Sequence, residues 1–216
     1  MPTKTAPIAI RICLLCIALL RAPLVYAQED PIQGIAALQN WASAVNSLRH
    51  NGFNQEQQLQ AVNQYFNRFS WRSDRQRWQS DDHWSSSFDT IRNRQGDCED
   101  LSIAKFTTLL ALGFKERQLH LHYVYSRPIK AGHMVLSVRL ENGRQLVLDS
   151  LSDSLSPLSQ RSDLQSIYRF NREGLWIPKL SQDKRSHSLL PSWKNLLQND
   201  PMLRNPELLS TQLASL

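Results

Sequence analysis

One segment constrains the fold more than any other: Gly96-Asp97-Cys98-Glu99-Asp100, followed by an apolar run that ends at Gly113. The run contains Leu101, Ile103, Ala104, Phe106, Leu109, Leu110 and Leu112. A helix built from it is apolar on most of its surface, and Gly113 suits the left-handed position just after a helix end. The segment therefore predicts a buried helix with a cysteine in its first turn.

The surroundings of this cysteine favour a chemical role. The positive end of a helix dipole, together with a nearby imidazole, lowers the pKa of a thiol. The alternative is a small apolar cysteine that fills the core. However, Asp97, Glu99 and Asp100 place three carboxylates around Cys98, and their repulsion would raise the pKa of the thiol. The pattern indicates a cysteine nucleophile whose acidic neighbours need an offsetting positive charge.

Residues 1–27 are predicted to be a secretory signal peptide. Basic residues precede an apolar run over residues 12–20, and Val25-Tyr26-Ala27 has the small-x-small pattern of a cleavage site. Arg21 interrupts the run, which is therefore too short to span a bilayer as a helix. We expect export and cleavage before Gln28, with an uncleaved anchor as the alternative.

Removal of this leader changes the charge and the cysteine count. The leader carries Lys4, Arg11 and Arg21 and no acidic residue, so the formal net charge falls from +6 to +3. This weak charge, without clustered basic and aromatic residues, argues against a nucleic-acid-binding protein. Cys98 is then the one remaining cysteine and has no partner for an internal disulfide.

Two amphipathic helices are predicted before the cysteine segment. The first has apolar residues at helical spacing from Ile35 and ends at Asn51-Gly52. The second begins after Asn54, which forms a capping box with Gln57. Both helices are expected to pack over the core without taking part in chemistry.

Residues 67–97 are polar and show little periodicity, which is typical of a long loop. Four aromatic residues lie in this segment: Trp71, Trp78, Trp84 and Phe88. They argue against disorder, so we expect an ordered loop layer beside the cysteine.

The charged residues of this loop favour a solvated surface. The arginines mix with polar residues and Asp74, namely Arg68, Arg72, Arg75 and Arg77. Asp81, Asp82 and His83 could add ligands or substrate contacts, but a solvated turn is the preferred interpretation.

After Gly113 the apolar residues alternate with a period near two, which indicates strands. Three strands are expected, from residue 119 to 126, from 133 or 134 to 140, and from 146 to 149. Asn142-Gly143 provides a hairpin turn between the last two. The result is an antiparallel meander with one face packed on the cysteine helix, an α+β arrangement.

Three histidines of these strands are candidates for a site. His120 and His122 share a strand face, but no further Cys or His at ligand spacing completes a zinc site. His133 follows a turn, so its imidazole is expected to be exposed at the sheet end. Asp149 ends the neighbouring strand, and a carboxylate buried there needs a partner.

Cys98, His133 and Asp149 match the nucleophile, base and orienting group of a hydrolase triad. A simple two-residue hairpin turn would place the last two side chains on opposite faces of the sheet. One bulged residue would bring both to the same face. The triad hypothesis therefore predicts a bulge or an irregular turn between residues 138 and 147.

Several short blocks resemble one known family. They are Gly96-Asp97-Cys98-Glu99-Asp100, Ala131-Gly132-His133-Met134-Val135-Leu136 and Val147-Leu148-Asp149-Ser150, with further matches at Trp78, Asp82-His83-Trp84 and Phe170-Asn171-Arg172-Glu173-Gly174-Leu175-Trp176. Over residues 50–176 the chain resembles the bacterial transglutaminase-like cysteine proteases of the LapG type. The resemblance implies a papain/transglutaminase-like α+β fold, in which N-terminal helices and a catalytic helix pack on an antiparallel sheet.

The same resemblance implies a chemistry. Cys98 would be the nucleophile, His133 the base and Asp149 the orienting carboxylate of a cysteine protease. The family is calcium-dependent, and its calcium ligands map to Asp97 and Glu99. A divalent cation with oxygen ligands would supply the positive charge that this acidic segment lacks.

The resemblance also implies a biological role. The protein would be a calcium-dependent periplasmic endopeptidase that cleaves a large surface adhesin near its N-terminus and releases cells from a biofilm. An inner-membrane receptor for cyclic di-GMP would hold it in check. Two alternatives stay open, a transglutaminase or amidase with the same triad and a non-catalytic calcium-binding interaction module.

The expected domain organisation follows from these observations. A signal peptide spans residues 1–27, the protease domain spans residues 28–180, and a tail of uncertain role spans residues 181–216. The leucine-rich tail is expected to dock on the domain or on a partner.

Overall fold

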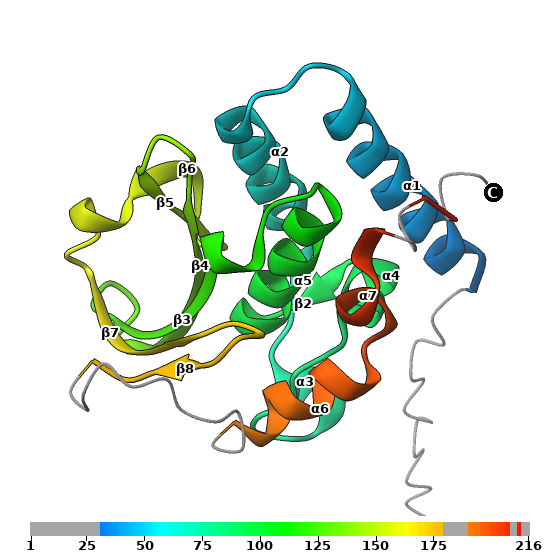
Figure 1. The fold of residues 1–216 in the computed structure, drawn as a ribbon. Coiled ribbons are helices and arrows are strands. Elements are labelled where there is room, and N and C mark those ends of the chain that lie inside the picture. Colours follow the sequence, from blue (N-terminus) through cyan, green and yellow to red (C-terminus); the bar gives the residue numbers. More distant parts are fainter. Residues whose placement is uncertain (1–30, 179–189, 208–210, 213–216) are drawn as a thin grey trace, which may run out of the picture.

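The computed structural model describes residues 31–178, 190–207 and 211–212. The predicted signal peptide lies outside these residues. Helices cover one face of a curved six-stranded antiparallel sheet, and two short strands form a separate parallel pair (Figure 1). This arrangement confirms the predicted α+β class. Among the described residues, no helix has both the length and the apolar character needed to cross a membrane.

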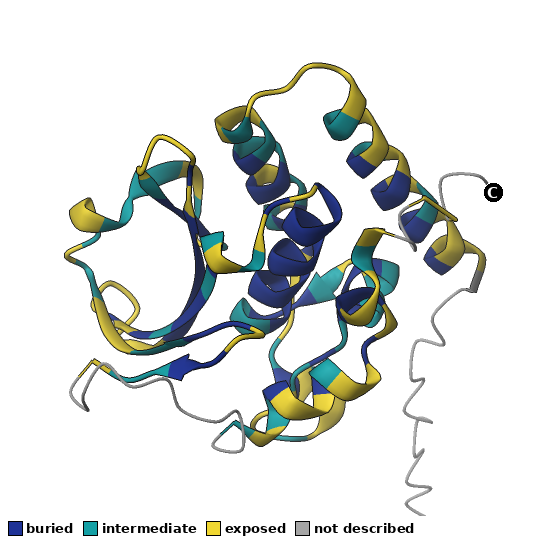
Figure 2. Ribbon diagram, in the orientation of Figure 1, coloured by how far each residue is buried: buried dark blue, intermediate teal, exposed yellow. Residues whose placement is uncertain are grey.

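The helical layer is organised around α5 (Cys98–Ala111), which is buried along almost its whole length (Figure 2). The helix ends as predicted, because Gly113 has a φ of 93° and its N–H donates to the carbonyl of Leu110. Helices α1 (Pro31–His50) and α2 (Gln55–Asn67) belong to the same layer. The predicted capping box at the start of α2 is present.

Residues 67–97 contain more regular structure than predicted. Two short helices, α3 (Asp74–Trp78) and α4 (Ser87–Asn93), lie within this segment. Strand β1 (Ser70–Trp71) pairs in parallel with β2 (Gln95–Gly96), directly before the cysteine. Elements this short contain too few residues to show a period, so the sequence pattern could not reveal them.

The large sheet has the order β6-β5-β4-β3-β7-β8. Its strands are β3 (Leu119–Ser126), β4 (Ala131–Arg139), β5 (Gln145–Asp149), β6 (Ser152–Pro157), β7 (Leu164–Phe170) and β8 (Leu175–Trp176), with short 3₁₀ helices η1 (Glu116–Gln118) and η2 (Leu158–Gln160). The three predicted strands are confirmed. The other three were not predicted, because β6 and most of β7 are only partly buried and lack strong apolar alternation.

The two faces of the sheet support different cores. Met134, Leu136 and Val138 of β4 join the large core around α5. The opposite, concave face carries a smaller core of Val124, Val135 and Val147, with partly buried Leu158 and Leu164 packed on it. The segment between β6 and β7 therefore covers part of the concave face (Figure 1).

The described part of the predicted tail docks on the domain through α6 (Pro191–Asn199) and α7 (Pro201–Arg204). Trp193 is fully buried, and its ring contacts Phe106 and Phe170 edge to face at 5.8 and 5.1 Å between centroids. Its indole N–H donates to the carbonyl of Asn171 (3.1 Å). These contacts make the helices of this segment part of the same core.

Candidate active site and acidic cluster

The hairpin between β4 and β5 sets the geometry of the site. Leu136 pairs with Leu148, one residue away from the register of a simple two-residue turn. Gly143 has a φ of 82°, and its N–H donates to the carbonyl of Leu140 (3.0 Å). The predicted irregular turn is therefore present. As a result, the last residue of β5 shares a sheet face with His133.

His133 and Asp149 form a buried pair on this face. The Nε2 atom of His133 lies 2.8 Å from Oδ1 of Asp149, and the two side chains are 2% and 1% exposed. The expectation of an exposed His133 is wrong, because β4 begins at Ala131 and so places His133 inside the strand, opposite Val124.

Asp149 is held from several sides. Its Oδ1 also accepts the N–H of Leu151 (2.9 Å), and its Oδ2 accepts from the guanidinium of Arg161 (2.8 Å). Burial alone would raise the pKa of this carboxyl, but the hydrogen bonds from His133, Leu151 and Arg161 hold the pKa below its usual range. Asp149 is therefore ionised, and His133 Nε2 carries the shared proton.

Arg161 was missed at the sequence level. It lies 12 residues after Asp149, outside any predicted element, and the only local signal is Asp163 two positions later. The carbonyl of Asp149 has a further partner, because the side chain of Asn67 in α2 donates to it (3.0 Å).

Cys98 is the first residue of α5 and is a free, partly buried cysteine. The backbone N–H of Met134, the residue after His133, lies near the Cys98 sulfur and favours a lower pKa of the thiol. The hydroxyl of Ser102 donates to the carbonyl of Met134 (2.9 Å), which ties the first turns of α5 to the same strand. The Cys98 sulfur therefore lies beside β4, one residue along the chain from His133, where the start of α5 meets this strand.

The thiol faces negative charge. It donates to Oε2 of Glu99 at 2.9 Å. Burial raises the pKa of the Cys98 thiol above its usual value, and the carboxylates of Glu99 and Asp97 raise it further. A counter-charge on these carboxylates would favour the thiolate.

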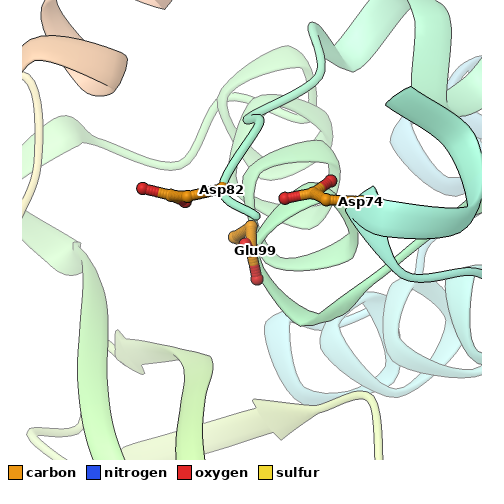
Figure 3. Close-up of side chains that lie close together, drawn as sticks. All are labelled: Asp74, Asp82 and Glu99. Atoms are coloured by element: carbon orange, nitrogen blue, oxygen red, sulfur yellow. The ribbon is translucent and has the colours of Figure 1, made fainter. Parts of the chain in front are cut away.

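Five carboxylates surround the first turn of α5, and we call them the acidic cluster: Asp74, Asp82, Asp97, Glu99 and Asp100. They form two overlapping groups that share Asp74, and in each group ligand oxygens lie within 4.8 Å of one another. Figure 3 shows one group, with Asp74 from α3, Glu99 from α5 and Asp82 from the loop between α3 and α4.

Two oxygens of the acidic cluster, Asp74 Oδ1 and Asp97 Oδ1, are buried and have no hydrogen-bond partner among the described residues. Burial raises the pKa of Asp97 to about 9, with repulsion from Glu99, Asp100 and Asp74 adding to the effect. Unpartnered carboxylate oxygens gathered in this way are what an oxygen-coordinated cation such as Ca²⁺ needs. The residues present therefore fit a calcium ion, with Asp74 and Asp82 beside the two predicted ligands.

Asp100 differs from the rest of the cluster because its partners come from the protein. Its Oδ2 accepts from Arg77 (2.9 Å), and its Oδ1 accepts the N–H of Ser85 (2.7 Å). The Arg77 side chain is 6% exposed and Asp74 is also buried, so the solvated-face interpretation is wrong for these two residues. Helix α3 places them three positions apart on one inward face.

In the loop between α3 and α4, one aspartate belongs to the acidic cluster and its neighbour faces the solvent. Asp82 belongs to the acidic cluster, although a solvated turn was the preferred interpretation. Asp81 matches that interpretation, since it forms an exposed ion pair with Arg75. The backbone N–H of His83 donates to Oδ2 of Asp74 (2.5 Å), so the loop is anchored to α3.

The zinc alternative finds no support in the described residues. His122 Nε2 bonds the hydroxyl of Ser137 (2.8 Å), and the ring of His120 packs edge to face on Trp176. Burial lowers the pKa of His120 to about 4 and of His122 to about 3. The candidate metal clusters of the described residues contain carboxylates and neither histidine.

Comparisons with known proteins point in one direction. Residues 40–175 match the family described as bacterial transglutaminase-like cysteine proteinase BTLCP. The structure is similar to that of EGTA-treated LapG from Legionella pneumophila, at 32% identity and a TM-score of 0.65 over 76% of this chain and 96% of that one. For the calcium-bound form of that protein the values are 34% and 0.64 over 78% and 98%. No curated protein matches the chain.

Proposed function

Because the chain belongs to the bacterial transglutaminase-like cysteine proteinases, we propose that Cys98, His133 and Asp149 are the catalytic triad of this cysteine protease. One observation carries the assignment. The buried His133–Asp149 hydrogen bond lies directly beside Met134, whose N–H lies near the Cys98 sulfur.

The contacts of each side chain suggest its role. Asp149 accepts the Nε2 proton of His133, which leaves Nδ1 as the ring atom that takes the proton of Cys98. The thiolate then attacks a peptide carbonyl, and backbone N–H groups at the start of α5 stabilise the oxyanion. The imidazolium protonates the leaving amine, the peptide C–N bond breaks, and water hydrolyses the thioester.

The enzyme is proposed to depend on calcium, held by Asp97 and Glu99 together with Asp74 and Asp82. The unpartnered buried oxygens of the acidic cluster and the calcium-bound form of a related protein support this ligand set. When bound, the ion would neutralise carboxylates that oppose ionisation of the thiol.

The proposed substrate is a large surface adhesin cut near its N-terminus, with release of cells from a biofilm. The proposed compartment is the periplasm, reached after removal of residues 1–27, and the proposed inhibitor is an inner-membrane receptor for cyclic di-GMP. Similarity to LapG supports the substrate class, and the signal-peptide pattern of residues 1–27 supports the compartment. The inhibitor follows from the family resemblance alone.

Incubation of the mature protein with an N-terminal adhesin fragment tests the activity. Two shorter products are expected in calcium and none with Cys98→Ala, while Cys98→Ala should still bind the fragment in a pull-down assay. A heavier cross-linked band would instead indicate a transglutaminase. Cleavage by Cys98→Ala at the wild-type rate would overturn the triad.

A further inference from the structure

Two further charged side chains, Arg161 and Asp163, continue the hydrogen-bonded series from Asp149 on the side away from His133. Arg161 donates from one terminal nitrogen to Oδ2 of Asp149 at 2.8 Å. It donates to Oδ1 and Oδ2 of Asp163 at 2.9 and 2.8 Å. The Arg161 side chain is 14% exposed and bridges the Asp149 side chain, which is 1% exposed, to the Asp163 side chain, which is 33% exposed.

The turn that carries Arg161 is itself fixed. The N–H of Arg161 donates to the carbonyl of Leu158 (3.2 Å), and its own carbonyl accepts from the N–H of Leu164 (3.1 Å). The N–H of Arg127 donates to the carbonyl of Asp163 (3.0 Å). Arg161 therefore reaches Asp149 from the segment between β6 and β7, an element independent of β4 and β5.

The two oxygens of Asp149 have separate partners. Oδ1 faces His133 and the N–H of Leu151, whereas Oδ2 faces Arg161. A carboxylate held only at Oδ1 could rotate about its Cβ–Cγ bond and tilt away from the imidazole. A guanidinium with planar, fixed donors on Oδ2 opposes this rotation.

We propose that Arg161 is a positioning residue that keeps Oδ1 of Asp149 on His133, and that Asp163 orients the Arg161 guanidinium. This inference rests on the proposed function, since it requires the His133–Asp149 pair to serve Cys98. A purely structural alternative is that Arg161 only stabilises the turn between β6 and β7.

The rate at which iodoacetamide alkylates Cys98, measured at one neutral pH with calcium, reports on the pair without a peptide substrate. Arg161→Ala should slow alkylation about tenfold, the effect of losing one buried charge-assisted hydrogen bond. Arg161→Lys should recover part of the rate, because an ammonium keeps the charge but cannot hold both carboxylates in a fixed plane.

Arg169→Ala is the matched control. Arg169 lines the same cavity of about 710 Å³ on the concave face as Arg161 does, and its guanidinium lies over Trp176 at 5.6 Å. The Arg169→Ala substitution removes one positive charge but leaves the hydrogen bonds among Arg161, Asp149 and His133 in place. The alkylation rate should therefore stay at the wild-type value. A loss equal to that of Arg161→Ala would assign the effect to net charge and overturn the proposal.

A double mutant separates positioning from folding. If Arg161 acts through Asp149, then Asp149→Asn and Asp149→Asn combined with Arg161→Ala should be alkylated at the same rate. A further tenfold loss in the double mutant would indicate a structural role. Millimolar guanidinium should restore part of the rate to Arg161→Ala, because Arg161 borders a cavity that a small cation can enter, and should leave the rate of Arg169→Ala at the wild-type value.

The outcomes separate this inference from the proposed function. A wild-type Cys98 that reacts no faster than free cysteine overturns both. A fast wild type with an equally fast Arg161→Ala overturns the role of Arg161 alone. If Arg161→Ala does not fold, Arg161→Lys and Asp163→Asn decide: reduced rates with unchanged melting temperatures support the role, and wild-type rates refute it.

Discussion

Asp149 and the acidic cluster beside Cys98 differ in how the protein satisfies their oxygens. On one side, Asp149 has both oxygens satisfied by His133, Leu151 and Arg161. On the other, the acidic cluster leaves oxygens of Asp74 and Asp97 buried without partners among the described residues. Asp149 is offset by Arg161 of the same chain, whereas Arg77 pairs with Asp100 of the acidic cluster and the proposed calcium ion would offset the other carboxylates. The protein would therefore combine a permanent electrostatic element at Asp149 with a calcium-dependent one beside Cys98, the proposed nucleophile.

The largest expected effect on activity comes from a substitution in the His133–Asp149 pair. His133→Ala should lower kcat/KM by about 10⁴-fold, because it removes the proposed base for the thiol proton. Calcium affinity measured by calorimetry should stay unchanged, since His133 belongs to neither metal group. Cleavage by His133→Ala at a rate near that of the wild type would show that the His133–Asp149 pair is not needed for activity.

Removal of calcium tests the calcium-dependent element. Without the ion, burial and repulsion from Glu99 oppose the thiolate, so activity should fall about 10²-fold. Added calcium should restore it, whereas His133→Ala should respond to neither treatment. Full cleavage in excess EGTA would show that the acidic cluster is compensated without calcium.

Substitution of Asp97 should change the sign of its effect with the ion. Without calcium, Asp97→Asn should stabilise the fold by about 1 kcal/mol, because it removes a buried carboxylate that has no partner for one oxygen. With calcium it should destabilise, because it removes a ligand. Urea unfolding with and without calcium measures both, and exposed Asp81→Asn is the control. The same sign in both conditions would exclude Asp97 from the metal site.

The smallest effect is a slope of stability with pH. In calcium-free protein the folded pKa of Asp97 is raised to about 9, so the folded state holds a proton that the unfolded state releases above its ordinary pKa. Stability should therefore fall as pH rises from about 5 toward 9, and calcium or Asp97→Asn should flatten this slope. Asp149 has the opposite shift, so its contribution persists over this range and is lost only in stronger acid. Melting temperatures across this pH range test both statements.

Local sequence patterns determined the elements that carry the site. The apolar run ending at Gly113 predicted α5, the capping box at Asn54 predicted the start of α2, and alternation predicted β3 to β5. These features depend on neighbours within a few residues, which is why a single sequence reveals them. The sequence did not predict α3 and α4, which are too short to show a period. It also did not predict β6 and β7, whose apolar residues alternate only weakly.

Long-range burial was outside the reach of sequence reasoning. Arg77 looked like one of several solvated arginines, yet it pairs with Asp100 inside the domain. Lys105 sits in the centre of α5, fully buried, with its ammonium donating to the side-chain oxygens of Asn63 (2.8 Å) and Asn67 (2.7 Å). Sequence reasoning places a charged side chain at the surface unless its buried partner is known. The partners of Arg77 and Lys105 are more than 20 residues away in the chain.

The sequence by itself determined that Cys98 opens a buried helix among carboxylates and that a histidine and an aspartate follow on adjacent strands. Only the tertiary structure decided how these residues face one another. A one-residue change in hairpin register brings His133 and Asp149 to the same face, the turn after β6 brings in Arg161, and α3 adds Asp74 to the acidic cluster. The reason is physical. The sequence gives the type of each side chain, but strand register and packing across the whole domain decide which side chains meet.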